Sequence, residues 1–289
     1  MSVVINTNVD SLKVQSNLTN ATSKLSKAME RMSTGLKVTN AKDDAAGTVI
    51  AARMTVQMNG NKIAQNNVQN GSAMLATAEG HLDVIQDNLT RIRDLTLQAM
   101  NGTYSAEEKE AMQDEVAERI AEMDRVSNSS KYSSLQLFGG DLATGGAKFQ
   151  VGANATTNDT ITADEDLFKS VKFVDIVKDD STTYADNASF NISTMSASQL
   201  TAAVQALDAG IDNLTSRRSI IGSAQNRLES ALDTLTTQYE NLSSAKSVIL
   251  DADIAQEASN FTQQNILQQV STSLLAQANQ APSIALSLI

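Results

Sequence analysis

Apolar residues recur with helical spacing over one long stretch of the chain, residues 200–242. Steps of four and three residues alternate there without interruption, which is the spacing of a coiled-coil seam. A continuous helix over this stretch would be about 65 Å long at ~1.5 Å per residue, so we predict an elongated helical bundle. The seam consists of Leu200, Val204, Leu207, Ile211, Leu214, Arg218, Ile221, Gln225, Leu228, Leu232, Leu235, Tyr239 and Leu242.

Two further stripes precede this seam. The first has the same alternating spacing in one register and is followed by the turn signal Asn101-Gly102. After it, Ser105 and Glu108 have the spacing of a capping box, which predicts the start of another helix. Three helices with compatible stripes indicate a bundle. The stripes are Ala64, Val68, Gly71, Leu75, Ala78, Leu82, Ile85, Leu89 and Ile92, and then Met112, Val116, Ile120 and Met123.

The pattern changes between residues 132 and 190, which hold 7 of the 10 aromatic residues. Two glycine pairs lie there, at Gly139-Gly140 and Gly145-Gly146. The runs 148–151 and 171–174 alternate apolar and polar residues with period two, which is typical of strands. We therefore expect a small insert rich in β-hairpins within a mainly α fold.

Both ends of the chain are amphipathic, and neither apolar stripe can be covered by its own helix. Residues 1–40 carry a net charge of +3 and residues 251–289 a net charge of −3, so we expect the two ends to lie side by side. The stripes are Val14, Leu18, Ala21, Leu25, Ala28 and Met32 at the first end, and Ile254, Ala258, Phe261, Leu267, Val270, Leu274 and Ala278 at the other.

Composition limits the classes of function. The net charge is −11 and no dense Lys/Arg run occurs, so nucleic acid is not an expected partner. No window approaches the apolar length of a membrane span, and the first residues lack the pattern of a signal peptide. We expect neither membrane insertion nor, if the protein is exported, a cleaved leader. Cysteine is absent from the sequence, which excludes disulfides and thiol catalysis.

Candidate catalytic chemistry is sparse. His81 is the single histidine, so no His-Glu-x-x-His zinc site or pair of histidines exists, and we interpret it as a residue on a solvated helix face. Asp43 and Asp44 diverge on a helix rather than converging on one ion, so with Lys42 they indicate a salt-bridged helix start or a domain junction. The glycine pairs lack the residues of a phosphate loop and predict turns. We expect no catalytic, metal-binding or cofactor-binding residues and no cofactor.

Several segments together resemble bacterial flagellins, over about residues 1–160 and 197–289. Near the first end these are VINTN at 4–8, ERMSTGL at 30–36 and AKDDAAG at 41–47. Near the other end they are ILQQ at 266–269, LAQANQ at 275–280 and LSL at 286–288. In between, FQVGAN at 149–154 and QNRL at 225–228 also match, and all of these segments occur in the order of the family.

The resemblance implies an extracellular structural subunit that is exported unfolded and polymerises into the flagellar filament for swimming motility. It implies partners in the export apparatus, a secretion chaperone, the filament cap and a hook-associated junction protein, besides further copies of the chain. We expect residues 1–42 with 250–289 to form the inner terminal-helix coiled coil, 43–174 with 197–249 a helical-bundle domain with a β-hairpin, and 175–196 a short variable outer loop. The expected filament-core residues are Val14, Leu18, Leu25, Met32, Phe261, Leu267, Val270 and Leu274.

Flagellins recognised by Toll-like receptor 5 carry an Arg-x-Arg-Glu-Leu motif on one helix and a glutamate on the next. Arg91, Leu95 and Glu115 match these positions, while Asp94 replaces the glutamate of the motif. The resemblance therefore implies the receptor as a further partner. The alternative is that Arg91 and Glu115 serve only as charges between helices or subunits.

Three other functions compete with the filament subunit. A hook-filament junction protein of the flagellin family shares such ends but is present in few copies. A flagellin with a metallopeptidase insert would need the His-Glu-x-x-His motif, which this sequence lacks. An intracellular coiled-coil scaffold would not be found outside intact cells.

Overall fold

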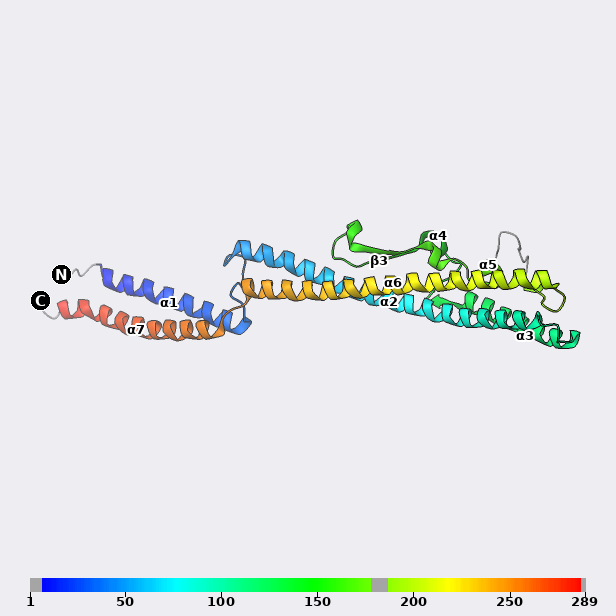
Figure 1. The fold of residues 1–289 in the computed structure, drawn as a ribbon. Helices are drawn as coiled ribbons and strands as arrows, with labels where there is room; N and C mark the ends of the chain where they lie inside the picture. Colours follow the sequence, from blue (N-terminus) through cyan, green and yellow to red (C-terminus); the bar gives the residue numbers. More distant parts are fainter. Residues whose placement is uncertain (1–6, 178–186, 287–289) are drawn as a thin grey trace. The chain divides into compact units, whose positions relative to one another are not determined.

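The computed structural model describes residues 7–177 and 187–286, and the fold is mainly α, as predicted. The long helices are α1 (Val9–Thr34), α2 (Ala45–Ala99), α3 (Ala106–Ser129), α6 (Ala197–Leu250) and α7 (Ile254–Leu286) (Figure 1). Between α3 and α6 lie β1 (Lys131–Tyr132), β2 (Leu135–Gln136), α4 (Leu142–Gly145), β3 (Ala147–Gln150), β4 (Thr160–Ala163) and α5 (Phe173–Ile176). Short 3₁₀ turns occupy Thr157–Asp159, Glu165–Phe168 and Asn187–Ser189.

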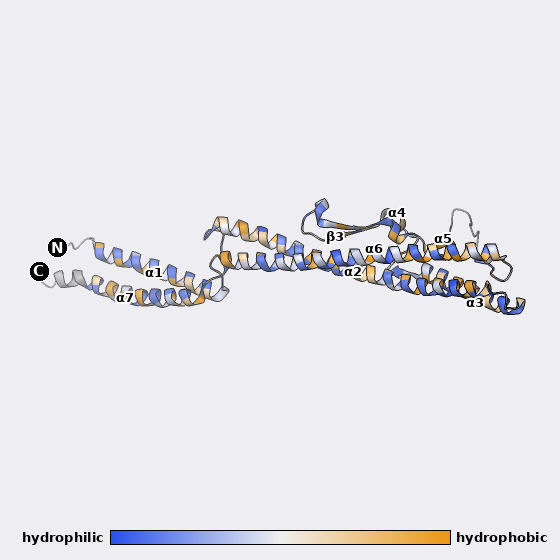
Figure 2. Cartoon of the chain, viewed as in Figure 1, coloured by the Kyte–Doolittle hydropathy of each residue, from blue (hydrophilic) through white to orange (hydrophobic). Residues whose placement is uncertain are grey.

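The chain forms two compact units, residues 1–58 with 240–289 and residues 59–239. The predicted division of the chain into domains at 42/43 and 249/250 stays a prediction. Hydrophilic and hydrophobic residues alternate along the helices of both units, as an amphipathic pattern requires (Figure 2).

In residues 59–239 the predicted stripes form the core. α2 and α6 run antiparallel there, as the hydrogen bonds from Gln65 to Thr236 and from Gln225 to Glu79 show. Each fully buried Leu or Ile contributes about 1.5–3 kcal/mol relative to an exposed one, so this seam carries much of the stability of the unit. The buried seam residues include Leu75, Leu82, Ile85, Leu89 and Ile92 of α2, Val116, Ile120 and Met123 of α3, and Leu207, Leu214, Ile221 and Leu228 of α6.

The start of α3 confirms the capping box. The Ser105 side chain accepts a hydrogen bond from the Glu108 backbone N–H at 3.3 Å, and the Glu108 carboxylate accepts one from the Ser105 backbone N–H at 2.7 Å. Two donors at the helix start are thereby satisfied. The predicted break at Asn101-Gly102 lies in the turn that precedes this cap.

The predicted hairpin at 148–151 is confirmed as β3 paired antiparallel with β4, with Phe149 opposite Ile161. It lies against two glycines of α2. A Cβ on Gly71 would come within 2.7 Å of the Phe149 ring, and a Cβ on Gly60 within 2.7 Å of the Ala153 Cβ. The hairpin therefore packs on α2 only because these helix positions lack side chains. Gly139 and Gly146 adopt the positive φ expected of turns.

The prediction of a strand at 171–174 was wrong. Val171 and Phe173 are buried and Lys172 is exposed, so the alternation reported burial correctly. No strand among the described residues pairs with the segment, however, and the Phe173 backbone N–H donates to Asp124 Oδ1 of α3 at 3.2 Å at the start of α5. Phe173 and Val174 belong to the first turn of α5, so an alternating run of four residues did not distinguish a strand from the start of a helix.

The described residues before α6 are attached to α3 by hydrogen bonds and to α5 by an aromatic contact. The Gln113 side chain accepts from the Ile192 N–H at 2.8 Å and donates to the Phe190 carbonyl at 3.1 Å. The Phe190 ring packs edge-on against Phe173, with centroids 5.0 Å apart. Within the predicted outer loop 175–196, residues 178–186 lie outside the described residues.

In the unit formed by residues 1–58 and 240–289, α1 ends at Gly35, whose φ is +73° and whose N–H donates to the Arg31 carbonyl. The backbone then pairs with the segment between α6 and α7 through the hydrogen bonds Lys37 N–H to Leu250 O and Ala252 N–H to Gly35 O. These bonds hold the turn after α1 against the turn before α7.

The predicted salt-bridged helix start at 42–44 is confirmed as well. The Lys27 ammonium lies 2.6 Å from the Asp43 carboxylate. Asp44 accepts a hydrogen bond from the Gly47 N–H at 2.9 Å and so caps α2. The two adjacent carboxylates make different contacts, as expected of neighbouring side chains that point in different directions.

Candidate functional site

The two ends of the chain pair as antiparallel helices, α1 with α7, as their opposite charges led us to expect (Figure 1). Asn8 accepts from the Ser11 N–H at 3.0 Å, which caps α1, and also donates to the Ala278 carbonyl at 2.7 Å. Ser11 donates to Asn279 at 2.8 Å. One N-cap residue therefore begins α1 and attaches it to the far part of α7.

The predicted assembly residues of α1 face its partner helix. Val14, Leu18, Leu25 and Met32 are half-buried, and they alternate along one face with the buried Ala21 and Ala28. Residues with this spacing lie on one stripe of a helix. The α1 stripe is thus largely covered within the chain itself, although its larger side chains keep an exposed edge.

The predicted residues of α7 divide into two groups. Phe261 is half-buried, whereas Leu267, Val270 and Leu274 are 44%, 47% and 46% exposed. The less exposed positions of α7 include Gln264, Gln268, Ser271, Leu275 and Ala278, so polar side chains form much of the contact with α1. We call Ile266, Leu267, Val270 and Leu274 the outer face of α7, since helical spacing places them together on a side left uncovered by the chain.

One ion pair is largely buried between α1 and α7. Arg31 lies 3.0 Å from Glu257, whose residue is 8% exposed. The Arg31 Nε is buried with no partner among the described residues. Breaking such a pair leaves a charge without compensation, so the contact specifies how the helices align.

The sequence interpretation missed a second group of exposed apolar residues. Val49 and Val56 of α2 are 54% and 72% exposed, and Val248 near the end of α6 is 77% exposed. Val49 and Val56 are seven residues apart, which is the repeat of a coiled-coil seam. That spacing could have revealed them, but the predicted stripe begins only at Ala64.

The predicted recognition residues Arg91 and Glu115 are brought together by α2 and α3. The guanidinium donates to both carboxylate oxygens, from Nε at 2.7 Å and Nη2 at 3.0 Å. These bonds hold the pKa of Glu115 below its ordinary value. Leu95 lies on the same helix but is 2% exposed, so it belongs to the core rather than to this surface.

A shallow acidic groove of about 520 Å³ adjoins this pair. It is lined by Asn88, Asp114, Glu115, Glu118, Arg119 and Glu122. Arg119 donates to Asn88 at 3.2 Å and lies 3.6 Å from Glu115. The Arg91–Glu115 pair thus extends into a network on one surface of α2 and α3.

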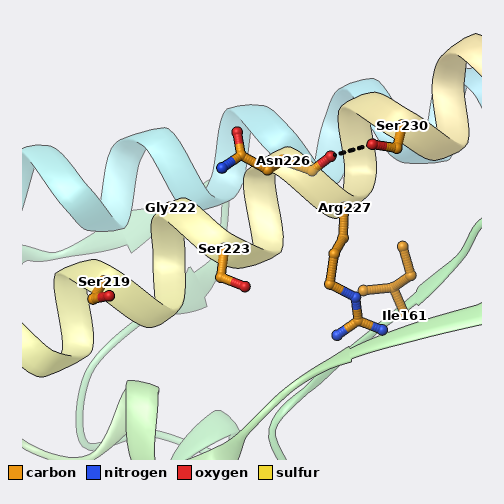
Figure 3. Close-up of a pocket in the computed structure, with 7 residues that line it drawn as sticks. All are labelled: Ile161, Ser219, Gly222, Ser223, Asn226, Arg227 and Ser230. Atoms are coloured by element: carbon orange, nitrogen blue, oxygen red, sulfur yellow. Dashed lines mark hydrogen bonds between the residues drawn. The ribbon is translucent and has the colours of Figure 1, made fainter.

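A second groove, of about 760 Å³, separates α6 from the β3–β4 hairpin (Figure 3). Figure 3 shows the Arg227 side chain extending from α6 toward Ile161 of the hairpin. The other lining residues are Ser219, Gly222, Ser223, Asn226 and Ser230. The described lining places no histidine or carboxylate beside these hydroxyls.

Comparison with known proteins identifies the family. Residues 5–143 match the family model of the bacterial flagellin N-terminal helical region, and residues 204–289 match that of the C-terminal helical region. The sequence is 36% identical to the flagellin of Bacillus subtilis over 99% of both proteins. The chain belongs to the bacterial flagellin family. It is also 37% identical to the Xenorhabdus nematophila flagellin over the full length of both, and 32% identical to the flagellar filament 33 kDa core protein of Treponema phagedenis over 99% and 100%.

The fold is shared beyond these relatives. A Vibrio parahaemolyticus protein, provisionally named a flagellar hook-associated protein, superposes with a TM-score of 0.57 at 15% identity, covering 72% of this flagellin and 99% of that protein. At that identity the likeness concerns the fold alone. This flagellin is a structural subunit of the flagellar filament, an extracellular appendage, and not an enzyme.

Three other expectations concern the described part of this flagellin: metal sites, membrane spans and His81. No group of three or more His, Asp or Glu side chains with the arrangement of a metal site occurs within it. None of the described helices has the length and apolar character to cross a bilayer. His81 is half-buried on α2 rather than fully solvated, and this burial lowers its pKa.

Proposed function

We propose that this flagellin polymerises for swimming motility through its terminal helices, with the outer face of α7 in contact with neighbouring copies. The observation that carries the proposal is the inverted pattern of α7. Polar residues occupy much of its contact with α1, while Leu267, Val270 and Leu274 remain exposed. A helix with this pattern buries its apolar face only when a second copy covers it.

The energetic gain is appreciable. Each of these three side chains keeps nearly half of its surface exposed, and full burial of a Val or Leu contributes about 1.5–3 kcal/mol. Covering the remaining half therefore contributes about 1 kcal/mol per residue and about 3 kcal/mol per subunit. At 1.4 kcal/mol per tenfold change, this corresponds to roughly a hundredfold in the affinity of a subunit for the filament end.

The variant Val270→Glu tests this contact, because it places a charge in the centre of the outer face of α7. We expect the monomer to fold normally, since Val270 is exposed, and the critical concentration for seeded polymerisation to rise by at least about a hundredfold. Sedimentation of polymer after seeding measures that concentration. Normal polymerisation of a folded Val270→Glu monomer would refute the assignment of this face.

Gln269→Glu is the matched control. Gln269 is the neighbouring residue, is exposed, and donates a local hydrogen bond to Asn265 of the same helix. The substitution adds the same charge to a different face of α7. We expect its critical concentration to stay close to that of the unmodified protein.

The remaining partners follow from the family and from the proposed assembly. We propose that the chain passes through the flagellar export apparatus with a secretion chaperone, and that it is added beneath the filament cap onto a hook-associated junction protein. Supplying this gene to a motile bacterium that lacks its own filament subunit tests the role. Recovery of long filaments and swimming is the expected result, and secretion without filaments would contradict it.

The alternative is a hook-filament junction protein of the same family. The fold shared with a hook-associated protein does not separate the two functions, since that likeness extends to the fold alone. Copy number does separate them. A filament subunit is the main protein of filaments sheared from the cell surface, whereas a junction protein is a minor one.

We also propose that Toll-like receptor 5 recognises the surface around Arg91 and Glu115. Both side chains are partly exposed and hold each other in a fixed bidentate geometry. Such a pair presents a rigid polar surface to a partner. The buried Leu95 would support this surface from the core rather than contact the receptor.

Reporter cells that express the receptor test this recognition. The double variant Arg91→Ala, Glu115→Ala should lose signalling at concentrations where the unmodified monomer is active. The control double variant Asp166→Ala, Lys169→Ala removes another exposed ion pair, which is not part of the acidic groove, and should retain signalling. Equal signalling by both double variants would contradict the proposal.

A further inference from the structure

Three Asn-Gly dipeptides occur in this flagellin, and the fold places them in two different settings. Asn59-Gly60 and Asn70-Gly71 lie inside α2, whereas Asn101-Gly102 lies in the turn between α2 and α3. From this contrast we infer that Asn101 is a site of spontaneous deamidation and that the two helical asparagines are protected from it.

The reaction needs no partner other than water. The backbone nitrogen of Gly102, after losing its proton to hydroxide, attacks Cγ of Asn101 and forms a new bond to it. As the tetrahedral intermediate collapses, the amide nitrogen Nδ2 takes a proton from water and the bond between Cγ and Nδ2 breaks. Ammonia leaves, hydroxide is regenerated, and a five-membered succinimide remains. Water then opens either carbonyl of the ring, which produces aspartate or isoaspartate at position 101. No oxidation or reduction takes place.

The turn provides what the attack requires. Asn101 and Gly102 are both exposed, and nothing lies within 4 Å of the position that a Cβ on Gly102 would take. No acceptor for the Gly102 N–H is found among the described residues, so this nitrogen is free of the helical hydrogen-bond ladder. The flexible backbone of glycine allows the nitrogen to approach Cγ.

One hydrogen bond also favours the reaction. Asn101 Oδ1 accepts from the Thr103 backbone N–H at 3.3 Å. The attack places negative charge on this oxygen, because the C=O bond becomes single in the intermediate. A donor aimed at that oxygen stabilises the developing charge, as a backbone N–H does in an oxyanion hole.

The helical asparagines lack these conditions. The N–H groups of Gly60 and Gly71 lie within the continuous ladder of α2 and are committed to carbonyls one turn earlier. Gly71 is also covered by the Phe149 ring and Gly60 by Ala153. Attack there requires local opening of α2 and displacement of the hairpin. The deamidation rate is therefore reduced to the small fraction of molecules in which α2 is open.

The product changes the turn chemically. An amide becomes a carboxylate shortly before the first residue of α3, where Glu107 and Glu108 already lie. Isoaspartate also adds a methylene to the backbone of the loop. A filament subunit would thus accumulate negative charge at one defined turn with time since synthesis.

Incubation of the folded monomer in mildly alkaline buffer, followed by tryptic peptide mapping with fragmentation, tests the inference. Cleavage after Arg93 and Lys109 isolates Asn101 in a peptide with no other asparagine. We expect Asn101 to deamidate at least about tenfold faster than Asn59 or Asn70 in the folded protein. In denaturant all three should react at similar rates, because the protein then has no helices.

Gly102→Ala is the matched variant, since the open space around Gly102 accepts a Cβ without a clash. It should retain the fold and slow deamidation at Asn101 by at least about tenfold, because the methyl group hinders the attacking nitrogen. Asn101→Asp provides the reference for the mass and chromatographic position of the product. Equal rates at the three asparagines in the folded protein, or an Asn101 that reacts only in denaturant, would overturn the inference.

Discussion

The packing of the β3–β4 hairpin on α2 makes a sharp prediction for Gly71. Alanine in a helix interior is about 0.5–1 kcal/mol more stable than glycine, because glycine loses more backbone entropy on folding. At Gly71 the added Cβ would lie 2.7, 3.0 and 3.2 Å from three carbons of the Phe149 ring. Phe149 is itself buried, so the ring has little freedom to move away.

Overpacking of this kind typically costs about 1–3 kcal/mol. The cost outweighs the helical gain, so we expect Gly71→Ala to lower the free energy of unfolding by about 1 kcal/mol. Gly80→Ala is the control on the same helix, since nothing lies within 4 Å of a Cβ at that position. It should raise the free energy of unfolding by about 0.5–1 kcal/mol.

Urea and thermal unfolding of the two monomers, followed by circular dichroism, measure the difference. The difference in unfolding free energy between the two variants equals the packing cost at Gly71. It should appear as a difference in Tm of about 2–4 °C for each kcal/mol in a unit of this size. In a Phe149→Ala background the clash is removed, and Gly71→Ala should then stabilise as Gly80→Ala does. If Gly71→Ala stabilises the unmodified protein as much as Gly80→Ala does, the hairpin does not pack on Gly71.

Three further predictions concern the helix starts and the assembly stripe. Ser105→Ala removes one half of the capping box and should lower the free energy of unfolding by about 1 kcal/mol, while Ser105→Asp, which keeps an acceptor, should retain most of it. The hydrogen bond from Lys27 lowers the pKa of Asp43 from 3.8 to about 2. Because the folded pKa lies below the unfolded one, this contact stabilises the fold above about pH 4 and loses its effect as the pH falls toward about 2. In a carboxyl NMR titration, Lys27→Met should therefore raise the midpoint of Asp43, and an unchanged midpoint would contradict the assignment. Leu25→Asp should leave residues 59–239 folded but abolish polymerisation, since a charge in the α1 stripe has no partner there; electron microscopy showing normal filaments would indicate that the stripe is misassigned.

Much of the helical architecture was predictable because it depends on local spacing. The seam from Leu200 to Leu242 and the stripe from Ala64 to Ile92 are patterns with the period of a helix, and that period follows from backbone geometry in any context. The capping box at Ser105 was equally readable, since its two partners are three residues apart. The opposite charges of the two ends predicted that they pair, and the structure contains an ion pair between them, Arg31–Glu257.

Other features depended on residues far apart in the sequence. The run 171–174 alternates as a strand does, but only the position of Asp124 on α3 shows that its backbone hydrogen bond goes to a side chain. Gly71 fits the α2 stripe as any small residue would. Only the fold shows that Phe149 occupies the space of its missing side chain.

The candidate assembly site divides in the same way. The spacing of apolar residues predicted that α7 has two different faces. It did not predict which of these faces the partner helix covers. The tertiary structure placed many of the polar residues against α1 and left Leu267, Val270 and Leu274 exposed. Pairing is decided by the sum of contacts along both helices, among them the bonds of Asn8 and Arg31, and such a sum cannot be read from either segment alone.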